Sequence, residues 1–286
     1  MTKSRIWRLF FFFGLPAILI GSSAGHIFFW DTISQGSRLP DFFYQNQFSS
    51  LFLPAHLDQG HPPLFQWYIA AGWLALGRTL AVSHWLMFPI LAGIFWQWSQ
   101  LVRGVFSPKR AWLGMALLLL DTTFLAQGIL VSPDLLLLFA FLLALNGILE
   151  RRSGPVIIGS ILLGMTSIRG IFMVAALFLT ALFRHFRTRR HLSSSQIFDI
   201  IRPWLPAAIV VSGWLVAHYL EAGWWISTPN ESWGSQRGIA SGSQILKNIL
   251  NGGWRLVDFG KIGVWLVLCL AAYRWWRRWR PKRVIP

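Results

Sequence analysis

Long apolar runs bordered by arginine and lysine dominate this sequence and restrict what it can fold into. The mean hydropathy is +0.51 and only 13% of the residues are charged, whereas an average soluble domain carries roughly 25%. The formal net charge is nevertheless +16, and the basic residues stand beside apolar runs. This combination indicates a membrane protein whose basic residues face lipid headgroups, with no nucleic acid as partner. The single cysteine, Cys269, excludes an intrachain disulfide.

The apolar runs predict an all-α, polytopic bundle of about eight transmembrane helices. The predicted spans are residues 6–24, 83–103, 111–131, 135–149, 154–168, 170–185, 203–220 and 261–276. The run 64–77 follows Pro62-Pro63 and is shorter than the roughly 20 residues that cross a bilayer, so we expect it to lie at the membrane interface. The amphipathic stretch Ile245–Leu250 predicts a second interfacial helix.

The distribution of basic residues predicts the orientation. With 64–77 at the interface and both termini in the cytoplasm, 19 of the 26 Lys and Arg residues lie inside, as the positive-inside rule requires. If 64–77 crossed the membrane, only 9 of the 26 would lie inside. We therefore expect one integral membrane domain over 1–286. Its two large loops, 25–82 and 221–260, lie on the outer side, and its basic tail, 274–286, lies in the cytoplasm. The expected location is a bacterial inner (plasma) membrane.

Asp31 stands where the first predicted span leaves the bilayer, directly after His26-Ile27-Phe28-Phe29-Trp30. A carboxylate at an apolar boundary is partly desolvated, and partial desolvation makes it more basic, which suits a general base. The alternative is a solvated helix terminus.

Gly60-His61-Pro62-Pro63-Leu64 is the sharpest local motif. Gly60 permits a tight turn and the two prolines start the helix that follows. His61 is thereby held at a helix N-terminus, where it can bind a phosphate oxygen or a sugar hydroxyl. A capping and turn function is an equal alternative.

Three further polar residues lie at predicted outer ends of spans. Asp134 follows Pro133 and either caps the next helix or lines a site. His84 enters the second span from outside. Arg169 lies at an outer turn, where an unpaired cation is costly. Its side chain either snorkels to the interface, binds a lipid phosphate or pairs with Asp121. Alternatively, Thr122 and Thr123 hold Asp121 in its neutral form.

Four segments occur in order over residues 6–220. They are Asp31 after the first span, Asp58-Gln59-Gly60-His61-Pro62-Pro63-Leu64, Leu130-Val131-Ser132-Pro133-Asp134, and Gly164-Met165-Thr166-Ser167-Ile168-Arg169-Gly170. This ordered set resembles the GT-C membrane glycosyltransferases, and most closely the protein-mannosyltransferase and aminoarabinose-transferase-like enzymes of glycosyltransferase family 39.

The resemblance implies a transferase that moves a sugar from a polyprenyl-phosphate-linked donor to a hydroxyl acceptor on the outer face. The acceptor is a protein, a lipid or a glycan. Asp31 would be the base of an inverting displacement. The substrate-binding residues would be Asp58 and His61, which orient acceptor or donor, His84 and Arg169, which contact the donor phosphate, and Asp134, a second acid near the cavity.

Two other functions are compatible with these features. The first is a non-catalytic membrane scaffold or lipid-linked-sugar-binding subunit derived from the same module. The second, a transporter for lipid-linked sugars, requires a polar path across the bilayer, and the inner halves of the predicted spans contain few polar residues. The pattern requires no cofactor. Asp31, Asp58 and Asp134 could together bind a divalent cation, but their spacing does not demand it. Membrane lipids are the remaining expected partner.

Overall fold

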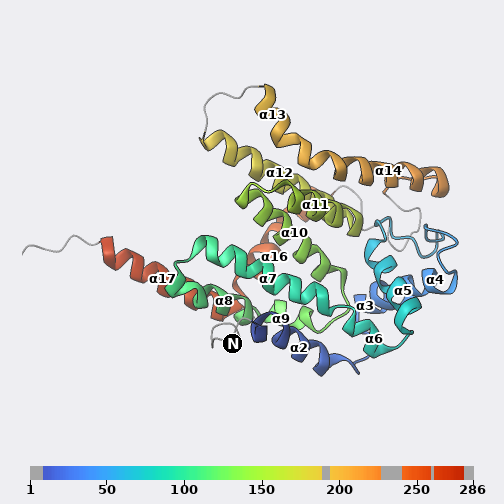
Figure 1. Cartoon of the computed structure of the whole chain (residues 1–286), viewed down its shortest axis with the longest axis horizontal. Coiled ribbons are helices and arrows are strands. Elements are labelled where there is room, and N and C mark those ends of the chain that lie inside the picture. Colours follow the sequence, from blue (N-terminus) through green and yellow to red (C-terminus); the bar gives the residue numbers. More distant parts are fainter. Residues whose placement is uncertain (1–8, 189–193, 227–239, 259–260, 280–286) are drawn as a thin grey trace, which may run out of the picture. The chain divides into compact units, whose positions relative to one another are not determined.

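The computed structural model describes residues 9–188, 194–226, 240–258 and 261–279. Every regular element within these ranges is a helix (Figure 1), which confirms the all-α prediction for this part of the chain. The helices form two compact units, one of residues 1–101 with 127–238 and one of residues 102–126 with 239–286. Each unit is described by itself, and the single membrane domain stays a prediction.

The first unit contains most of the helices. They are α2 (Leu15–Ser23), preceded by a π-helical turn (Phe10–Gly14), α3 (Asp31–Ile33), a π-helical turn (Ser34–Arg38), α4 (Leu39–Gln45), α5 (Leu64–Leu76), α6 (Leu80–Trp85), most of α7 (Phe88–Val105), α10 (Pro133–Glu150), α11 (Ser153–Thr166), α12 (Ile168–Thr188), α13 (Ser194–Ile201), a 3-10 turn (Arg202–Trp204) and α14 (Leu205–Ala222). Much of the predicted outer loop 25–82 is thus helical.

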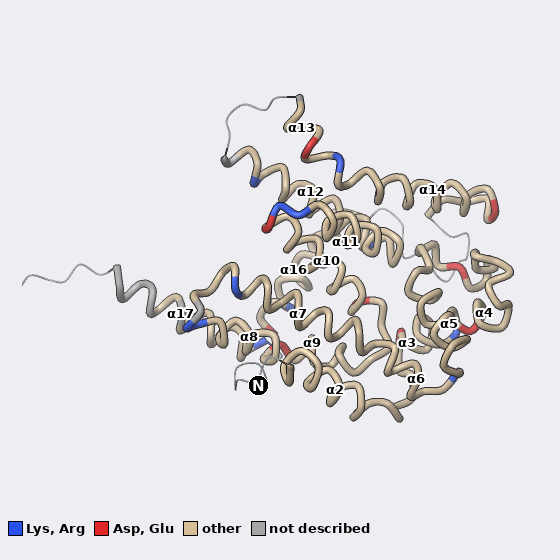
Figure 2. Tube along the Cα trace, viewed as in Figure 1, with Lys and Arg blue, Asp and Glu red and all other residues tan. Residues whose placement is uncertain are grey.

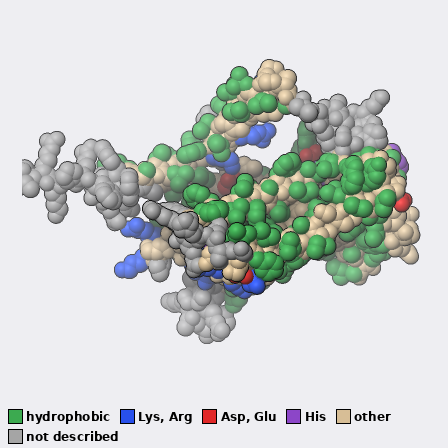
Figure 3. Space-filling view, turned by 90° about the horizontal axis from the view of Figure 1, so that it is seen from above, with side chains coloured by type: hydrophobic (Ala, Val, Ile, Leu, Met, Phe, Trp, Pro, Cys, Tyr) green, Lys and Arg blue, Asp and Glu red, His purple; other side chains and the backbone are tan. Residues whose placement is uncertain are grey.

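Four stretches among the described residues are long and apolar enough to cross a membrane. They are Leu80–Val105, Pro133–Glu150, Ile168–Phe186 and Ser195–Ala222. Only 11% of the apolar window within Ile168–Phe186 is buried within the structure, so most of its apolar surface is exposed. Figure 3 views the molecule from the side of α12 and α14 and shows hydrophobic side chains over much of this face. These features support a membrane protein.

The predicted count of eight spans is not confirmed. The described helices at Phe10–Ser23 and Ser153–Thr166 are apolar but shorter than 18 residues, and a perpendicular span needs about 20. The separation of 154–168 from 170–185 is confirmed, because Ser167 is extended (φ −166°, ψ 154°) and ends α11 before α12 begins. The run 64–77 forms the 13-residue helix α5; its place at the interface stays a prediction.

The core of the first unit lies between α10, α11 and α12. Small residues on α10, Ala140 and Ala144, are fully buried there with Leu163 of α11 and Leu177 of α12. Small side chains let helix backbones approach closely, which is how helices associate where water provides no driving force. This packing fixes α10, α11 and α12 relative to one another.

The second unit contains α8 (Ala111–Leu120), α9 (Thr122–Gly128), α16 (Gly242–Val257) and α17 (Ile262–Trp279). The predicted span 111–131 is broken, since α8 and α9 meet at an angle of 67°. Asp121 is the cause: its backbone is extended and its carboxylate accepts a 3.0 Å hydrogen bond from Phe124 N. Lys261 pairs with the same carboxylate at 2.9 Å, so the partner of Asp121 is not Arg169.

Parts of the predicted outer loop 221–260 and of the tail 274–286 lie outside the described residues. The amphipathic stretch Ile245–Leu250 belongs to α16, in which no residue is buried. The helix α17 at the last predicted span is not among the four span candidates. Its end carries Arg274, Arg277 and Arg278, which lower its suitability as a span.

Candidate active site

A small polar cavity of about 150 Å³ lies within the first unit. Its lining residues are Asp31, Thr32, Ser34, Gln35, Gln59, His61, Ser132, Pro133, Asp134, Thr166, Ser167 and Arg169. Four of the six predicted site residues, Asp31, His61, Asp134 and Arg169, therefore meet at one place although 138 positions separate the first from the last. The cavity is smaller than the roughly 300–1,000 Å³ of cavities that hold drug-sized ligands, so it would take one reacting group and not a whole lipid.

Asp31 is the first residue of α3 and is exposed. Trp30 before it has φ 53° and ψ −129°, a conformation that costs a non-glycine residue energy and is often found at functional sites. The buried Thr32 stabilises this turn, because its hydroxyl accepts from Phe29 N (2.7 Å) and donates to Phe29 O (2.6 Å). Within the described residues the Asp31 carboxylate has no hydrogen-bond or ion-pair partner, so it is available to a ligand.

His61 is oriented by the turn before it and by α12. Gly60 adopts φ 68°, as the motif predicts, and its N–H donates to Asp58 Oδ1 at 2.7 Å. The His61 ring approaches the start of α12, where Nδ1 accepts from Ile168 N at 3.4 Å and lies 3.5 Å from Ser167 Oγ. Because Nδ1 accepts, a neutral His61 carries its proton on Nε2 and acts there as a donor.

Arg169 and Asp134 form an ion pair across the cavity, with Arg169 Nη2 3.1 Å from Asp134 Oδ1. The sequence had suggested Asp121 as an acidic partner of Arg169, and the partner in the structure is instead Asp134. Asp134 is not the cap of α10, because Ser132 is the N-cap and its hydroxyl accepts from Asp134 N at 3.2 Å. The side chains of Arg169 and Asp134 remain 64% and 44% exposed, so both can still contact a ligand.

Backbone dipoles add to the electrostatics of the cavity. The first turns of two long helices line it, at Pro133 of α10 and at Ser167 and Arg169 before and within α12. The N-terminal end of a helix carries a partial positive charge, which favours a bound anion such as phosphate. The cavity thus combines an unpaired carboxylate at Asp31 with positive charge at the start of α12.

Two amide side chains that line the cavity, Gln35 and Gln59, form with Gln66 a hydrogen-bonded amide wall that no sequence pattern predicted. Gln66 Nε2 donates to Gln35 Oε1 (2.5 Å), Gln35 Nε2 donates to Gln59 Oε1 (2.5 Å), and Gln59 Nε2 donates to Ser34 Oγ (3.0 Å). Gln66 and Gln59 are buried. Such a chain fixes the direction of each amide and presents polar atoms of the kind that recognise sugar hydroxyls.

Two of the six predicted residues do not line this cavity. Asp58 is buried and bonds through Oδ2 to His218 Nε2 of α14 at 2.7 Å. His84 is buried on α6, with Nε2 3.1 Å from His26 O and Nδ1 3.4 Å from Ser23 Oγ. Both hold neighbouring segments together, and their contact with a donor stays a prediction.

His218 was not predicted, because one histidine inside an apolar run gives no motif. It is 1% exposed and lies between Trp214, stacked at 4.9 Å, and Trp224, edge-on at 4.6 Å. The pair that it forms with Asp58 connects α14 to the segment that carries His61. Among the described residues, no group of three or more His, Cys, Asp or Glu lies close enough together to hold a metal ion.

Comparisons with protein-family models, with curated proteins and with solved structures found no match for this chain.

Proposed function

We propose that this protein is a GT-C type glycosyltransferase that uses a polyprenyl-phosphate-linked sugar and transfers it to a hydroxyl acceptor at the outer face of the membrane. The observation that carries the proposal is the convergence of Asp31, His61, Asp134 and Arg169 on one polar cavity. Each comes from a different segment of the resemblance, and the four segments are far apart in the sequence.

Asp31 is suited to the role of base. Its carboxylate is exposed, unpartnered among the described residues and held on a short turn next to the cavity. In the proposed reaction it takes the proton of the acceptor hydroxyl as that oxygen bonds to the anomeric carbon. The bond from the anomeric carbon to the phosphate oxygen breaks at the same time, and the lipid phosphate leaves with the electron pair. A general base contributes about 10²–10⁴-fold to such a step.

Arg169 and the start of α12 are suited to the leaving phosphate. The guanidinium group is present in the cavity, and fixed positive charge aimed at developing negative charge is a large term in many enzymes. Asp134, 3.1 Å away, limits where the guanidinium group can go. We assign Gln35 and Gln59 of the amide wall to the sugar hydroxyls, and Gln66 to orienting Gln35.

The test is a transfer assay in proteoliposomes that contain the full chain. A panel of radiolabelled polyprenyl-phosphate sugars is offered together with membranes from the source cells, and label is followed in protein, glycolipid and glycan fractions. Label transferred from at least one donor, and absent from empty proteoliposomes, supports the proposal. Tight binding of a donor without any transfer would instead favour the lipid-linked-sugar-binding subunit.

A further inference from the structure

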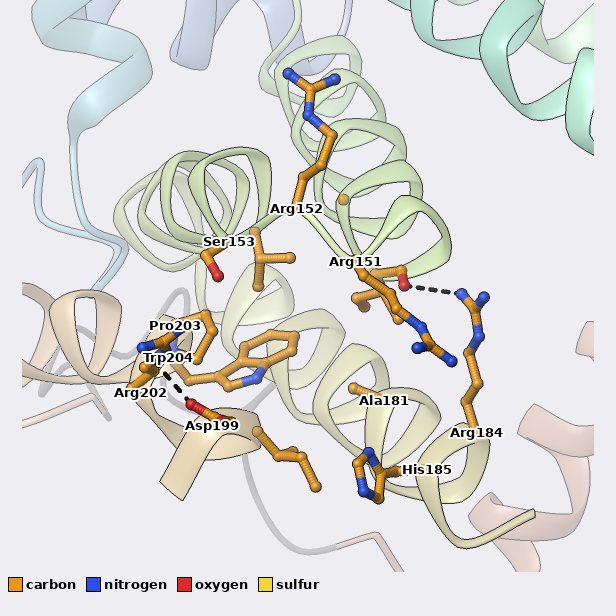
Figure 4. Close-up of a pocket in the computed structure, with 14 residues that line it drawn as sticks. Arg151, Arg152, Ser153, Ala181, Arg184, His185, Asp199, Arg202, Pro203 and Trp204 are labelled. Carbon is orange, nitrogen blue, oxygen red and sulfur yellow. Dashed lines mark hydrogen bonds and ion pairs between the residues drawn. The ribbon is translucent and has the colours of Figure 1, made fainter. Parts of the chain in front are cut away.

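A basic pocket of about 380 Å³ lies at the other end of α12 from Arg169 (Figure 4). Its walls come from the end of α10, the start of α11, the last turns of α12 and the junction of α13 with α14. Four arginines and one aspartate line it, which gives a net charge of 4 − 1 = +3 with His185 neutral. Figure 2 shows basic residues in this region of the first unit.

The arginines do not all have acidic partners. Arg202 pairs with Asp199 at 3.6 Å and Arg152 with Glu150 at 3.2 Å. Arg151 has no acidic partner within the described residues, and Figure 4 shows its guanidinium group on the same side as that of Arg184. Arg184 Nη1 donates to Ile148 O at 2.8 Å, which holds its guanidinium group at the pocket. Like charges repel each other, and a bound anion would lower that repulsion.

An apolar groove of about 440 Å³ adjoins the basic pocket. It runs between α11, α12 and α14, and Trp204 lines both hollows. Trp204 packs edge-on against Phe178 at 5.6 Å. From Trp204 the groove follows α14 to Leu215, which is about 16 Å along a helix that rises 1.5 Å per residue.

We propose that the two hollows together bind one anionic phospholipid, with its phosphate at Arg151 and Arg184 and an acyl chain along the groove. Charge and apolar surface adjoin in the order that such a lipid requires. A free phosphate ion would leave the groove empty, and an apolar molecule would leave Arg151 without an anionic partner among the described residues. The site is separate from the candidate active site, because Arg184 and Arg169 lie about 22 Å apart along α12 at 1.5 Å per residue.

The test uses native mass spectrometry of the full chain, titrated in detergent with phosphatidylglycerol and with phosphatidylcholine. The double variant Arg151→Gln/Arg184→Gln should weaken phosphatidylglycerol binding about thirty-fold, from the contribution of two basic residues near a lipid surface. The control Lys109→Gln/Arg110→Gln removes the same charge from exposed positions in the other unit and should change it less than threefold. Circular dichroism identifies any variant that fails to fold.

A second pair of variants tests the groove. Ala208→Trp fills it and should weaken phosphatidylglycerol binding while leaving the arginines in place; Ala176→Trp, exposed on α12 outside the groove, should not. Equal losses in the arginine variant and its control would overturn the proposal. The proposal would also be overturned if inorganic phosphate bound tightly and Ala208→Trp changed neither phosphate binding nor phosphatidylglycerol binding. The site would then bind anions alone, without an acyl chain in the groove.

Discussion

Asp58 accepts a 2.7 Å hydrogen bond from His218 across 160 positions of sequence, and both side chains are buried. The same carboxylate accepts from Gly60 N through its other oxygen. One buried group therefore fixes both α14 and the turn that precedes His61. Its removal should affect stability and site geometry together.

We expect Asp58→Asn to destabilise the protein by about 1–3 kcal/mol, because an amide offers one acceptor oxygen where the carboxylate offers two and leaves a buried group unpaired. The measurement is the midpoint of thermal unfolding in detergent. The control is Asp41→Asn, which removes a surface ion pair with Arg78 (2.9 Å) worth about 0–1 kcal/mol. Equal midpoints for the two variants would show that the Asp58–His218 bond has no structural importance.

Gly170 should be needed for the turn that carries Arg169. A Cβ atom at this position would overlap the carbonyl oxygen of Leu163, so Gly170→Ala forces the backbones of α11 and α12 apart. We expect a destabilisation of about 1–3 kcal/mol and a loss of transfer activity. Gly213→Ala, where a Cβ atom meets nothing within 4 Å, should be neutral or slightly stabilising.

Arg169 should matter for activity and little for stability. Its ion pair with Asp134 is largely exposed, and such pairs contribute about 0–1 kcal/mol. If Arg169 stabilises the leaving phosphate, Arg169→Gln should lower kcat/KM about 100-fold, and Arg169→Lys, which keeps the charge, should retain more activity. A variant in which activity and the unfolding midpoint fall together would indicate a structural role instead.

Sequence patterns predicted the helical class, the separation of α11 from α12, and, through the ordered motifs, four of the residues that line the cavity. They did not predict the break at Asp121, because one acid in an apolar run does not show whether the helix bends or the charge is paired. Lys261, the partner of Asp121, is 140 positions away. Hydropathy also predicted spans at Phe10–Ser23 and Ser153–Thr166, where the helices are shorter than 18 residues. Hydropathy records composition and does not show where a turn ends a helix.

The amide wall and His218 could not be predicted for a related reason. Gln35, Gln59 and Gln66 bond to one another only after α5 and the π-helical turn at Ser34–Arg38 have folded together. No local spacing distinguishes them from other glutamines. Side chains whose role depends on long-range contacts give no signal in one sequence.

The most direct measurement is the transfer rate of Asp31→Asn against wild type, with the same polyprenyl-phosphate sugar and with Asp41→Asn as control. The substitution keeps the shape of the side chain but removes the base. The account predicts that kcat falls by about 100-fold or more, with donor binding and the unfolding midpoint unchanged. Wild-type kcat in the Asp31→Asn protein would contradict it.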